Sequence, residues 1–556
     1  MGTRPIRNGR PISERNVMEF TTEPYEAIQF APALAMAMLE SVGIRRLLDD
    51  EAKGIDPSLR NLSTGMAAKA MIGTMFTEGV RKPLYRIGDQ YATAPVDKLF
   101  GNFVEHRTLS DTNLSAKLDT IFQMDREEVL WRIHTMLCER IGLSTDIYRF
   151  DSTNFPFYGV AYEDYSDGAI PKHSKTSKTK RYDLRQKNVQ AICDGNGLLM
   201  TTRCYDGNVS DVVMDMDSLD FLAKHIDCSR SYVCADCKLA LAGPILKTID
   251  LDLGFVTKCP QRFANLIRDD IVRSVMLGWM DESAEHEGRY IYDTHSEVEL
   301  DGKVVDLRFV AYRLPNAYSD AVKFYRTKAF SAMESRLVSL KRELFHCEKD
   351  AREAFDIVMG TDKEGIFRSE VDVFIDERKR KEDPEGPCWR AYFRNLRIDD
   401  DSLDRAASEY SINVLITNLP SADASADNLR FGATVDDIVD IYLGEFSIEH
   451  VFRLGKSGLG VDHMFLHTPS RQDAVVFLTS IASMISKAID IVLKRTTPKG
   501  KKTLTMKSIS DRKAGTVLRY HRERDGVTIL GEPGDQEFIF GILERLDIEP
   551  DLLLGY

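Results

Sequence analysis

Long apolar runs are scarce in this 556-residue sequence. A membrane-spanning helix needs about 20 consecutive apolar residues, and no run approaches that length. Residues 1–20 carry four arginines without the apolar stretch of a secretory signal. Hydrophobic residues make up 43% and charged residues 29% of the chain, which is ordinary for a globular protein. We therefore expect a cytoplasmic protein with no membrane contact.

Paired cysteines are also scarce. The nine cysteines are scattered, and the only C-x-x-C pair, Cys234 and Cys237, has no second pair at the spacing of a zinc site. We interpret the cysteines as the reduced thiols of a cytosolic protein. A redox or zinc role for the pair is the alternative, although a lone C-x-x-C at the end of an apolar strand is more often incidental.

Positive charge is in deficit over the whole chain, whose formal net charge is −13. Nucleic-acid binding depends on concentrated Lys and Arg, so this balance alone argues against it. Two segments nevertheless carry a local excess of positive charge. Residues 172–185 hold six basic residues against Asp183, and residues 494–524 hold eleven against Asp511 and Glu523. Such runs are usually solvated loops, but these two flank candidate carboxylates, as expected of an enzyme that handles DNA.

The spacing of apolar residues divides the chain into segments of different character. Between residues 25 and 145 apolar positions recur at helical spacing, whereas short apolar runs alternate with helical segments from 146 onward. The runs 188–193 and 198–204 flank an Asp-Gly-Asn-Gly turn, which predicts a β-hairpin. The predicted parts are a basic tail (1–24), a helical domain (25–145), a mixed α/β core in two pieces (146–259 and 410–493), an α+β insertion (260–409) and a basic C-terminal region (494–556).

Three features stand out inside the predicted insertion. Strand-like runs flank Asp301-Gly302, which predicts a second hairpin. Apolar residues from Phe330 to Ala351 step by three and four, which predicts one long helix whose seam packs within its own domain. An interface with another copy is the alternative. We expect Trp279 in the core, with stacking on a displaced DNA base as the alternative.

Three carboxylates occupy positions that suit a metal site. Asp151 follows the strand-like run 147–150, and Asp236 follows the run 232–235. Glu449 lies on a helix that comes after the insertion. Each of them alone is more often a capping or solvated residue, so the hypothesis rests on the three together.

The helix around Glu449 carries a defined face. At about 100° per residue, Tyr442, Glu445, Glu449 and Lys456 fall within an arc of about 60°, and Arg453 lies beside it. One face therefore presents an aromatic ring, two acids and two bases. An exposed ladder of i, i+4 charge pairs would give the same pattern, so a solvated face is the alternative.

The residues of this helix face also follow a known spacing. Tyr442-x2-Glu445-x3-Glu449-x6-Lys456 resembles the Y-x2-R-x3-E-x6-K signature of bacterial insertion-sequence DDE transposases, with Glu445 where that family has Arg. Cys237 and Lys238 replace the Arg-Gly that more usually follows the second acid. The matching segments elsewhere are 150–153, 177–186, 205–211 and 233–238.

The resemblance implies an α/β fold: an RNase H-like mixed sheet as catalytic core, interrupted by the insertion, behind a helical N-terminal domain that binds DNA ends. Asp151, Asp236 and Glu449 would be catalytic and would hold two Mg²⁺ or Mn²⁺ ions. The partner would be double-stranded DNA, both terminal inverted repeats and target, bound by a homodimer at the bacterial nucleoid. The residues expected to contact DNA are Lys175, Lys178, Lys180, Arg181, Arg185, Tyr442, Arg453 and Lys456.

Two other functions use the same residues. A metal-dependent DNA nuclease would cut without joining strands. A domesticated, non-catalytic descendant would bind DNA only, and the departures at Glu445 and Cys237 keep this alternative open.

Overall fold

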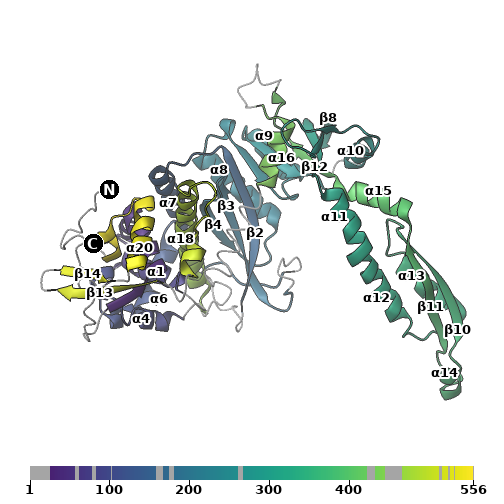
Figure 1. Cartoon of the computed structure of the whole chain (residues 1–556), viewed down its shortest axis with the longest axis horizontal. Coiled ribbons are helices and arrows are strands. Elements are labelled where there is room, and N and C mark those ends of the chain that lie inside the picture. The colour runs from purple at the N-terminus through teal and green to yellow at the C-terminus, as the bar shows by residue number, and fades with distance from the viewer. Residues whose placement is uncertain are drawn as a thin grey trace. The chain divides into compact units, whose positions relative to one another are not determined.

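We describe the protein from a computed structural model of the whole chain (Figure 1). Its residues fall into two compact units: unit 1 joins residues 1–238 to 444–556, and unit 2 holds residues 239–443. The predicted basic tail, 1–24, lies outside the described residues. The ranges described are 26–56, 62–77, 83–101, 103–157, 167–174, 181–260, 267–422, 432–444, 466–511, 516–523, 526–530 and 533–554.

Helices dominate the first part of unit 1. They include α1 (Phe30–Val42), α2 (Ile44–Glu51), α3 (Thr64–Met75), α6 (Asp111–Gln123) and α7 (Arg126–Ile141). Ser63 and Ser110 cap α3 and α6, because each hydroxyl accepts the backbone N–H three residues further on. Gly43, with a φ of 89°, ends α1 in the left-handed conformation. A strand that was not predicted, β1 (Glu26–Gln29), precedes α1 and pairs with β13 (Val517–Glu523).

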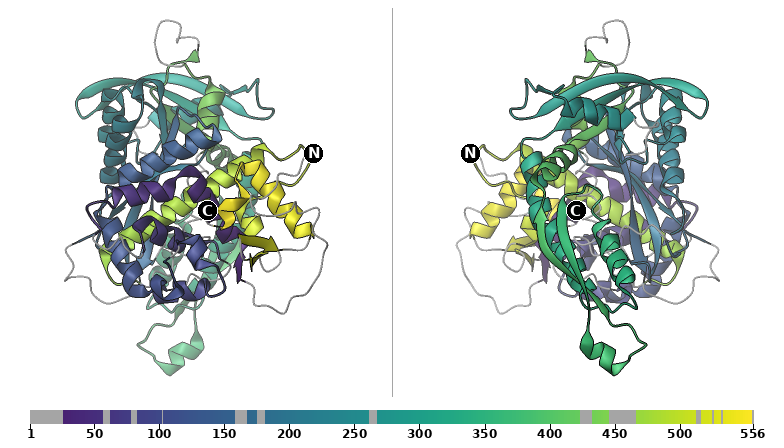
Figure 2. Two further views of the ribbon diagram at one scale, coloured as in Figure 1. Left: turned by 90° about the vertical axis from the view of Figure 1, so that its left-hand side faces the viewer. Right: turned by 90° about the vertical axis from the view of Figure 1, so that its right-hand side faces the viewer.

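One long helix forms the centre of the core of unit 1. By length and mean hydropathy α18 (Pro469–Arg495) is long and apolar enough to cross a membrane, although polar residues interrupt its apolar ones. Yet 78% of its most apolar window is buried inside the protein. It packs against α1, α3, α6 and α7 and against α20 (Pro533–Leu546), as Figure 2 shows. A helix that is apolar and buried on nearly all sides is here a core helix.

The strands of the unit 1 sheet follow the order β4-β3-β2-β5. They are β2 (Ile147–Phe157), β3 (Arg185–Asp194), β4 (Leu199–Tyr205) and β5 (Tyr232–Ala235). β3 runs antiparallel to both β2 and β4, whereas β5 lies parallel to β2. The predicted hairpin is confirmed as β3–β4. Helix α8 (Asp211–His225) connects β4 to β5, and the sheet is therefore mixed, as predicted.

β2 is longer than the sequence predicted. The expected strand ended before Asp151, but β2 continues to Phe157 and pairs with β3 along its whole length. The polar residues after Asp151 are compatible with a buried strand because they have hydrogen-bond partners: the Asn154 amide donates to Asn188, and the Ser152 hydroxyl donates to Asp211. Asp151 consequently lies within a strand and not at its end.

Helices cover both faces of this sheet. On one face the Gln190 amide donates to the Asp215 carboxylate of α8 over 3.1 Å. On the other face the hydroxyls of Thr202 and of Ser480 in α18 lie 2.8 Å apart. Figure 1 shows α7 and α18 together beside β3 and β4. Unit 1 is thus layered as helices, sheet and helices.

Unit 2 contains five antiparallel strands in the order β6-β12-β9-β8-β7. They are β6 (Gly254–Lys258), β7 (Asp281–Glu282), β8 (Tyr290–Leu300), β9 (Lys303–Arg313) and β12 (Asn413–Thr417). The hairpin predicted around Asp301-Gly302 is confirmed as β8–β9, and both turn residues have positive φ. The buried Arg308 side chain binds both oxygens of Asp293 and so links the two strands of the hairpin.

Trp279 lies outside the core, so the prediction of a buried side chain is wrong. It follows α10 (Ile267–Met276), is 59% exposed, and its ring centroid lies 6.5 Å from that of Tyr292. Leu277 beside it is exposed as well. The segment precedes β7, a strand of two exposed residues. β7 is the last strand at this edge of the sheet in the described part of unit 2.

A second, smaller core lies within residues 317–411 of unit 2. The single helix predicted over 330–351 is wrong, because α12 (Phe330–Leu340) ends and α13 (Glu348–Met359) begins within that range. Phe345, between the two helices, forms an isolated β-bridge with Trp389 that interrupts the helix. The other elements of this core are α11 (Ala317–Phe324), β10 (Phe367–Ile375), α14 (Glu377–Glu382), β11 (Trp389–Ile398) and α15 (Asp400–Ser411).

The predicted seam nonetheless packs within its own domain, which confirms the preferred interpretation. Met333, Leu337, Leu340 and Ala351 are all buried in the core of residues 317–411. They contact each other across α12 and α13, and side chains of β10 and β11 complete the cluster.

We expect Leu337→Ala to loosen this core locally. Leu337 is fully buried, so the lost contacts and the cavity cost about 2–5 kcal/mol. Hydrogen exchange of the β10 and β11 amides should accelerate, while exchange in β3 stays unchanged. Val338→Ala is the control, because the neighbouring Val338 is exposed and should have little effect. Equal exchange in the two variants would contradict the packing.

Candidate functional site

Asp151 and Asp236 are brought together by the parallel pairing of β2 with β5. The paired residues are Ile147 with Tyr232, Tyr148 with Val233 and Arg149 with Cys234. β5 ends at Ala235, and extending this register by two residues, one past the strand, would set Asp151 opposite Asp236. Neighbouring strands lie about 4.8 Å apart, and residues in register project from the same face of a sheet. We therefore expect the two carboxylates to be neighbours at the C-terminal end of β5.

The backbone orients both carboxylates. Asp151 accepts the N–H of Ser152 over 2.7 Å, and Asp236 accepts the N–H of Lys238 over 2.9 Å. Both aspartates are partly exposed. Asp151 pairs with Ala191 of β3, and Ala191 pairs with Thr202 of β4, so the three side chains project from the same face of the sheet. The Thr202 hydroxyl lies beside Ser480 of α18. The Asp151 side chain therefore projects on the face that α18 covers. Two accessible carboxylates on one face could supply part of the oxygen ligands that a hard divalent cation requires.

A third acid, Asp211, links the surroundings of the two aspartates. As first residue of α8, it accepts the Ser152 hydroxyl over 2.7 Å and forms an ion pair with the Lys238 ammonium. Ser152 follows Asp151, and Lys238 lies two residues after Asp236. Asp211 therefore connects the strand of one carboxylate to the loop of the other. Asp211 ends the matching segment 205–211, but it was not predicted as a site residue, since an acid at a helix N-terminus is usual for electrostatic reasons alone.

The predicted third metal ligand, Glu449, lies outside the described residues. So do three other members of its helix face, namely Glu445, Arg453 and Lys456. Tyr442 is described: it lies in α16 (Val435–Leu443) of unit 2 and is partly exposed. The buried Arg289 anchors α16, because its guanidinium pairs with Asp436 and Asp440 over 2.8 and 2.7 Å.

The basic segment 172–185 is partly neutralised by acids. Lys175, Lys178 and Lys180 lie outside the described residues. Arg181 forms an ion pair with Asp183 over 2.7 Å and holds the pKa of that carboxyl below its ordinary value. Arg185 begins β3, opposite the last residue of β2. In the second basic segment the side chains of Lys499, Lys501 and Lys502 are exposed.

None of the nine cysteines, all of which are described, forms a disulfide. The two members of the C-x-x-C pair differ in environment, since Cys234 is buried in β5 and Cys237 is exposed. Elsewhere in unit 1, burial raises the pKa of the Cys138 thiol to about 12, and the charge of Asp194 contributes to the shift.

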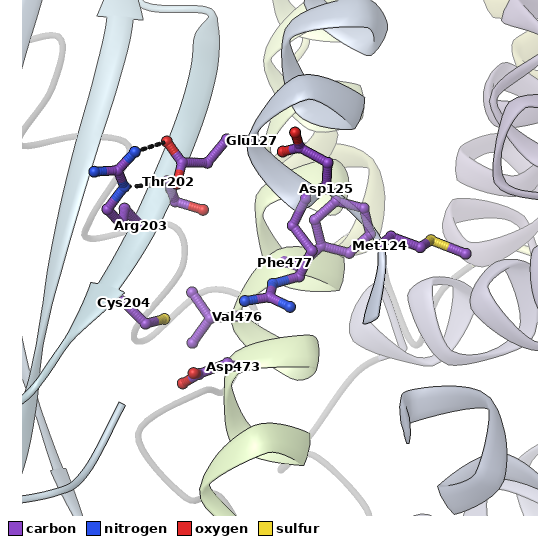
Figure 3. Close-up of a pocket in the computed structure, with 10 residues that line it drawn as sticks. Met124, Asp125, Glu127, Thr202, Arg203, Cys204, Asp473, Val476 and Phe477 are labelled. Atoms are coloured by element: carbon purple, nitrogen blue, oxygen red, sulfur yellow. Dashed lines mark hydrogen bonds and ion pairs between the residues drawn. The ribbon is translucent and has the colours of Figure 1, made fainter. Parts of the chain in front are cut away.

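A small cavity lies beside the edge strand β4, apart from the two aspartates (Figure 3). It is bounded by β4, α18 and the start of α7. The Arg203 guanidinium binds both oxygens of Glu127 there, over 2.5 and 2.7 Å. Its lining residues are Met124, Asp125, Arg126, Glu127, Thr202, Arg203, Cys204, Asp473, Val476 and Phe477. None of them belongs to the predicted site, and β4 is two strands away from β2.

Comparison with known proteins gives one match. The model of a family described as a domain of unknown function, DUF4277, matches residues 27–135. This range covers β1 and the helices from α1 to most of α7. A search of curated proteins gives no match.

An engineered disulfide tests whether Asp151 and Asp236 are neighbours. In the double variant Asp151→Cys/Asp236→Cys the facing positions lie within the Cα separation of about 4.4–6.8 Å that disulfides span. We expect mild oxidation to crosslink them, as read by peptide mass spectrometry. The control is Asp151→Cys alone, which keeps the natural Cys234 and Cys237. A crosslink from this single variant to Cys237 would mean that the register is shifted by one residue.

Proposed function

We propose that the chain is a DDE transposase that cleaves the ends of a DNA element and joins them to target DNA. The observation that carries the proposal is the parallel pairing of β2 with β5, because extending its register by two residues would set Asp151 beside Asp236. The order β4-β3-β2-β5 supports it too, since a central first strand between an antiparallel hairpin and a parallel strand is the arrangement expected of an RNase H-like core.

The donor set fits hard divalent cations. Asp151 and Asp236 offer carboxylate oxygens on one face of the sheet, and Glu449 is the third ligand that we propose from the sequence. Two Mg²⁺ or Mn²⁺ ions held by such a set supply activation of a water or DNA 3′-hydroxyl and stabilisation of the leaving oxygen. Phosphoryl transfer needs little further covalent help from a protein, because it depends on positioning and charge compensation.

The remaining residues of the proposed site position the carboxylates and the DNA. Asp211 pairs with the Lys238 ammonium and so offsets its positive charge. Arg181, Arg185 and the other basic residues predicted from the sequence would contact phosphates, which fixes the DNA without reading its sequence. Unit 2 separately presents the exposed ring of Trp279, and an aromatic ring of this kind stacks favourably on an unpaired base.

Replacing either aspartate should abolish DNA processing. We expect Asp151→Asn and Asp236→Asn each to lower cleavage by at least about 100-fold, because an amide of the same shape cannot supply a negatively charged ligand. Cleavage and strand transfer would be measured with Mg²⁺ on a duplex carrying the terminal repeats found on either side of the gene. Asp220→Asn, an exposed carboxylate on α8, is the control and should retain activity.

The same assay separates the alternative functions. Nicked DNA without joined product would indicate a nuclease. Binding without cleavage by the unaltered chain would indicate a non-catalytic descendant. Full activity of both aspartate variants would remove Asp151 and Asp236 from the site.

Asp211→Asn should weaken divalent-cation binding without removing a ligand. The variant releases the Lys238 ammonium, which then competes with the cation for Asp151 and Asp236. We expect a loss of about 10- to 100-fold in Mn²⁺ affinity, measured by electron paramagnetic resonance. The double variant Asp211→Asn/Lys238→Met removes the competitor and should restore most of the affinity. If the single variant bound Mn²⁺ as tightly as the unaltered chain, this positioning role would be refuted.

A further inference from the structure

A second group of metal-ligating side chains lies at the turn of the β3–β4 hairpin. His134 and Cys138 stand one helical turn apart on α7, and Asp194 is the last residue of β3. One ligand atom from each lies within 4.8 Å of the other two. Asp151 pairs with Ala191 of β3, and their side chains project from the same face of the sheet. Side chains alternate between the two faces along a strand, so Asp194, three residues after Ala191, projects from the opposite face. The group is therefore distinct from the proposed catalytic pair.

The distances within this group match those around a tetrahedral zinc ion. His134 Nε2 lies 3.4 Å from Cys138 Sγ and 3.5 Å from Asp194 Oδ2. Zinc binds sulfur at about 2.3 Å and nitrogen or oxygen at about 2.0–2.1 Å, so ligand atoms of one tetrahedron lie roughly 3.3–3.6 Å apart. Two of the three separations already have this length. Cys138 Sγ also lies 3.9 Å from His134 Nδ1, so the sulfur stands beside the imidazole ring, and the ring must turn for Nε2 to share an ion with the sulfur.

The surrounding contacts hold two of these side chains in position. Asp194 Oδ1 accepts the backbone N–H groups of Asn196 and Leu198, each over 2.8 Å, which turns Oδ2 toward the histidine. The Trp131 ring stacks on the His134 ring with centroids 5.5 Å apart and planes 19° apart. Contacts that orient ligands in this way are typical of metal centres and raise their affinity.

Burial and charge also favour a soft divalent cation here. Asp194 is 0% exposed and His134 is 6% exposed, whereas Cys138 is partly exposed. A thiolate and a carboxylate together balance the charge of one Zn²⁺, and a neutral imidazole adds none, so the occupied cluster is neutral. A mixed set of sulfur, nitrogen and oxygen donors selects zinc over Mg²⁺, in contrast to the all-oxygen set of Asp151 and Asp236.

We propose that His134, Cys138 and Asp194 bind one zinc ion, which fastens α7 to the β3–β4 hairpin. Binding displaces the Cys138 thiol proton to solvent, and a water fills the fourth position through the exposed side of that residue. The ion links the last helix matched by DUF4277 to the sheet that carries Asp151. The proposed ion is independent of DNA chemistry at the two aspartates.

Zinc binding by the full chain tests the proposal. The reduced protein would be equilibrated with zinc in excess Mg²⁺, so that oxygen-only sites are filled by Mg²⁺, and its metal content measured by mass spectrometry. We expect about one zinc ion per chain. Cys138→Ser and His134→Gln should each lose it, whereas Cys228→Ser, a partly exposed cysteine elsewhere in unit 1, should keep it. Asp236→Asn should keep it as well, which separates this site from the proposed catalytic one.

Two further readouts make the result independent of the folding of the variants. Co²⁺ in the unaltered chain should give the near-ultraviolet thiolate-to-cobalt band, and zinc should raise the melting temperature of the unaltered chain and of Cys228→Ser. No zinc uptake by the unaltered chain would overturn the proposal and leave the trio as a hydrogen-bonded group. Equal uptake by Cys138→Ser or His134→Gln, or a cobalt complex without a thiolate band, would overturn it too.

Discussion

The burial of α18 is the constraint on which unit 1 depends. Nine large apolar side chains of this helix, from Val475 to Leu493, are buried. They contact helices from the first 141 residues and the C-terminal helix α20, so segments from both ends of the chain share one core. The fully buried Lys187 ammonium on β3 pairs with Asp473 of α18 over 2.5 Å. Such a pair costs desolvation, and it fixes which part of the helix faces the sheet.

The position of β2 in the sheet determines what the aspartates can do. β2 is buried between β3 and β5, and its antiparallel and parallel partners fix its register on both sides. A shift by one residue would turn Asp151 to the other face, toward α8. The polar residues after Asp151 are part of this arrangement, because Ser152 and Asn154 bond to residues of α8 and β3. The site is thus held by ordinary sheet pairing and not by a flexible loop.

The sequence was informative wherever local chemistry decides the structure. Both hairpins were predicted correctly, because Asp-Gly and Asn-Gly turns adopt positive φ at little cost. The seam from Met333 to Ala351 was correctly placed in its own domain. In the candidate site, Asp151 and Asp236 were singled out as acids near strand ends, but their expected register depends on the pairing of residues 85 positions apart in the chain.

Long-range contacts account for the errors. A single helix over 330–351 agreed with the periodicity, but the bridge between Phe345 and Trp389 is made with a residue far along the chain. β2 was predicted too short because the polar run after Asp151 finds its partners on other elements. Trp279 was expected to be buried on hydrophobicity alone, whereas its exposure follows from the edge position of β7. Asp211 lay in a matching segment, but its contact with Lys238 was not predicted because the two residues are 27 positions apart in the chain.

The late position of α18 in the chain also governs how the protein is made. Unit 2 lies between the strands of unit 1 and this helix in sequence. At about 5–20 residues per second, unit 2 takes on the order of 10 to 40 s to leave the ribosome. During that interval the apolar faces of α3, α6 and α7 have no α18 to cover them, while unit 2 is able to close its own core. A nascent chain halted before residue 469 would therefore present these faces to chaperones or to other chains.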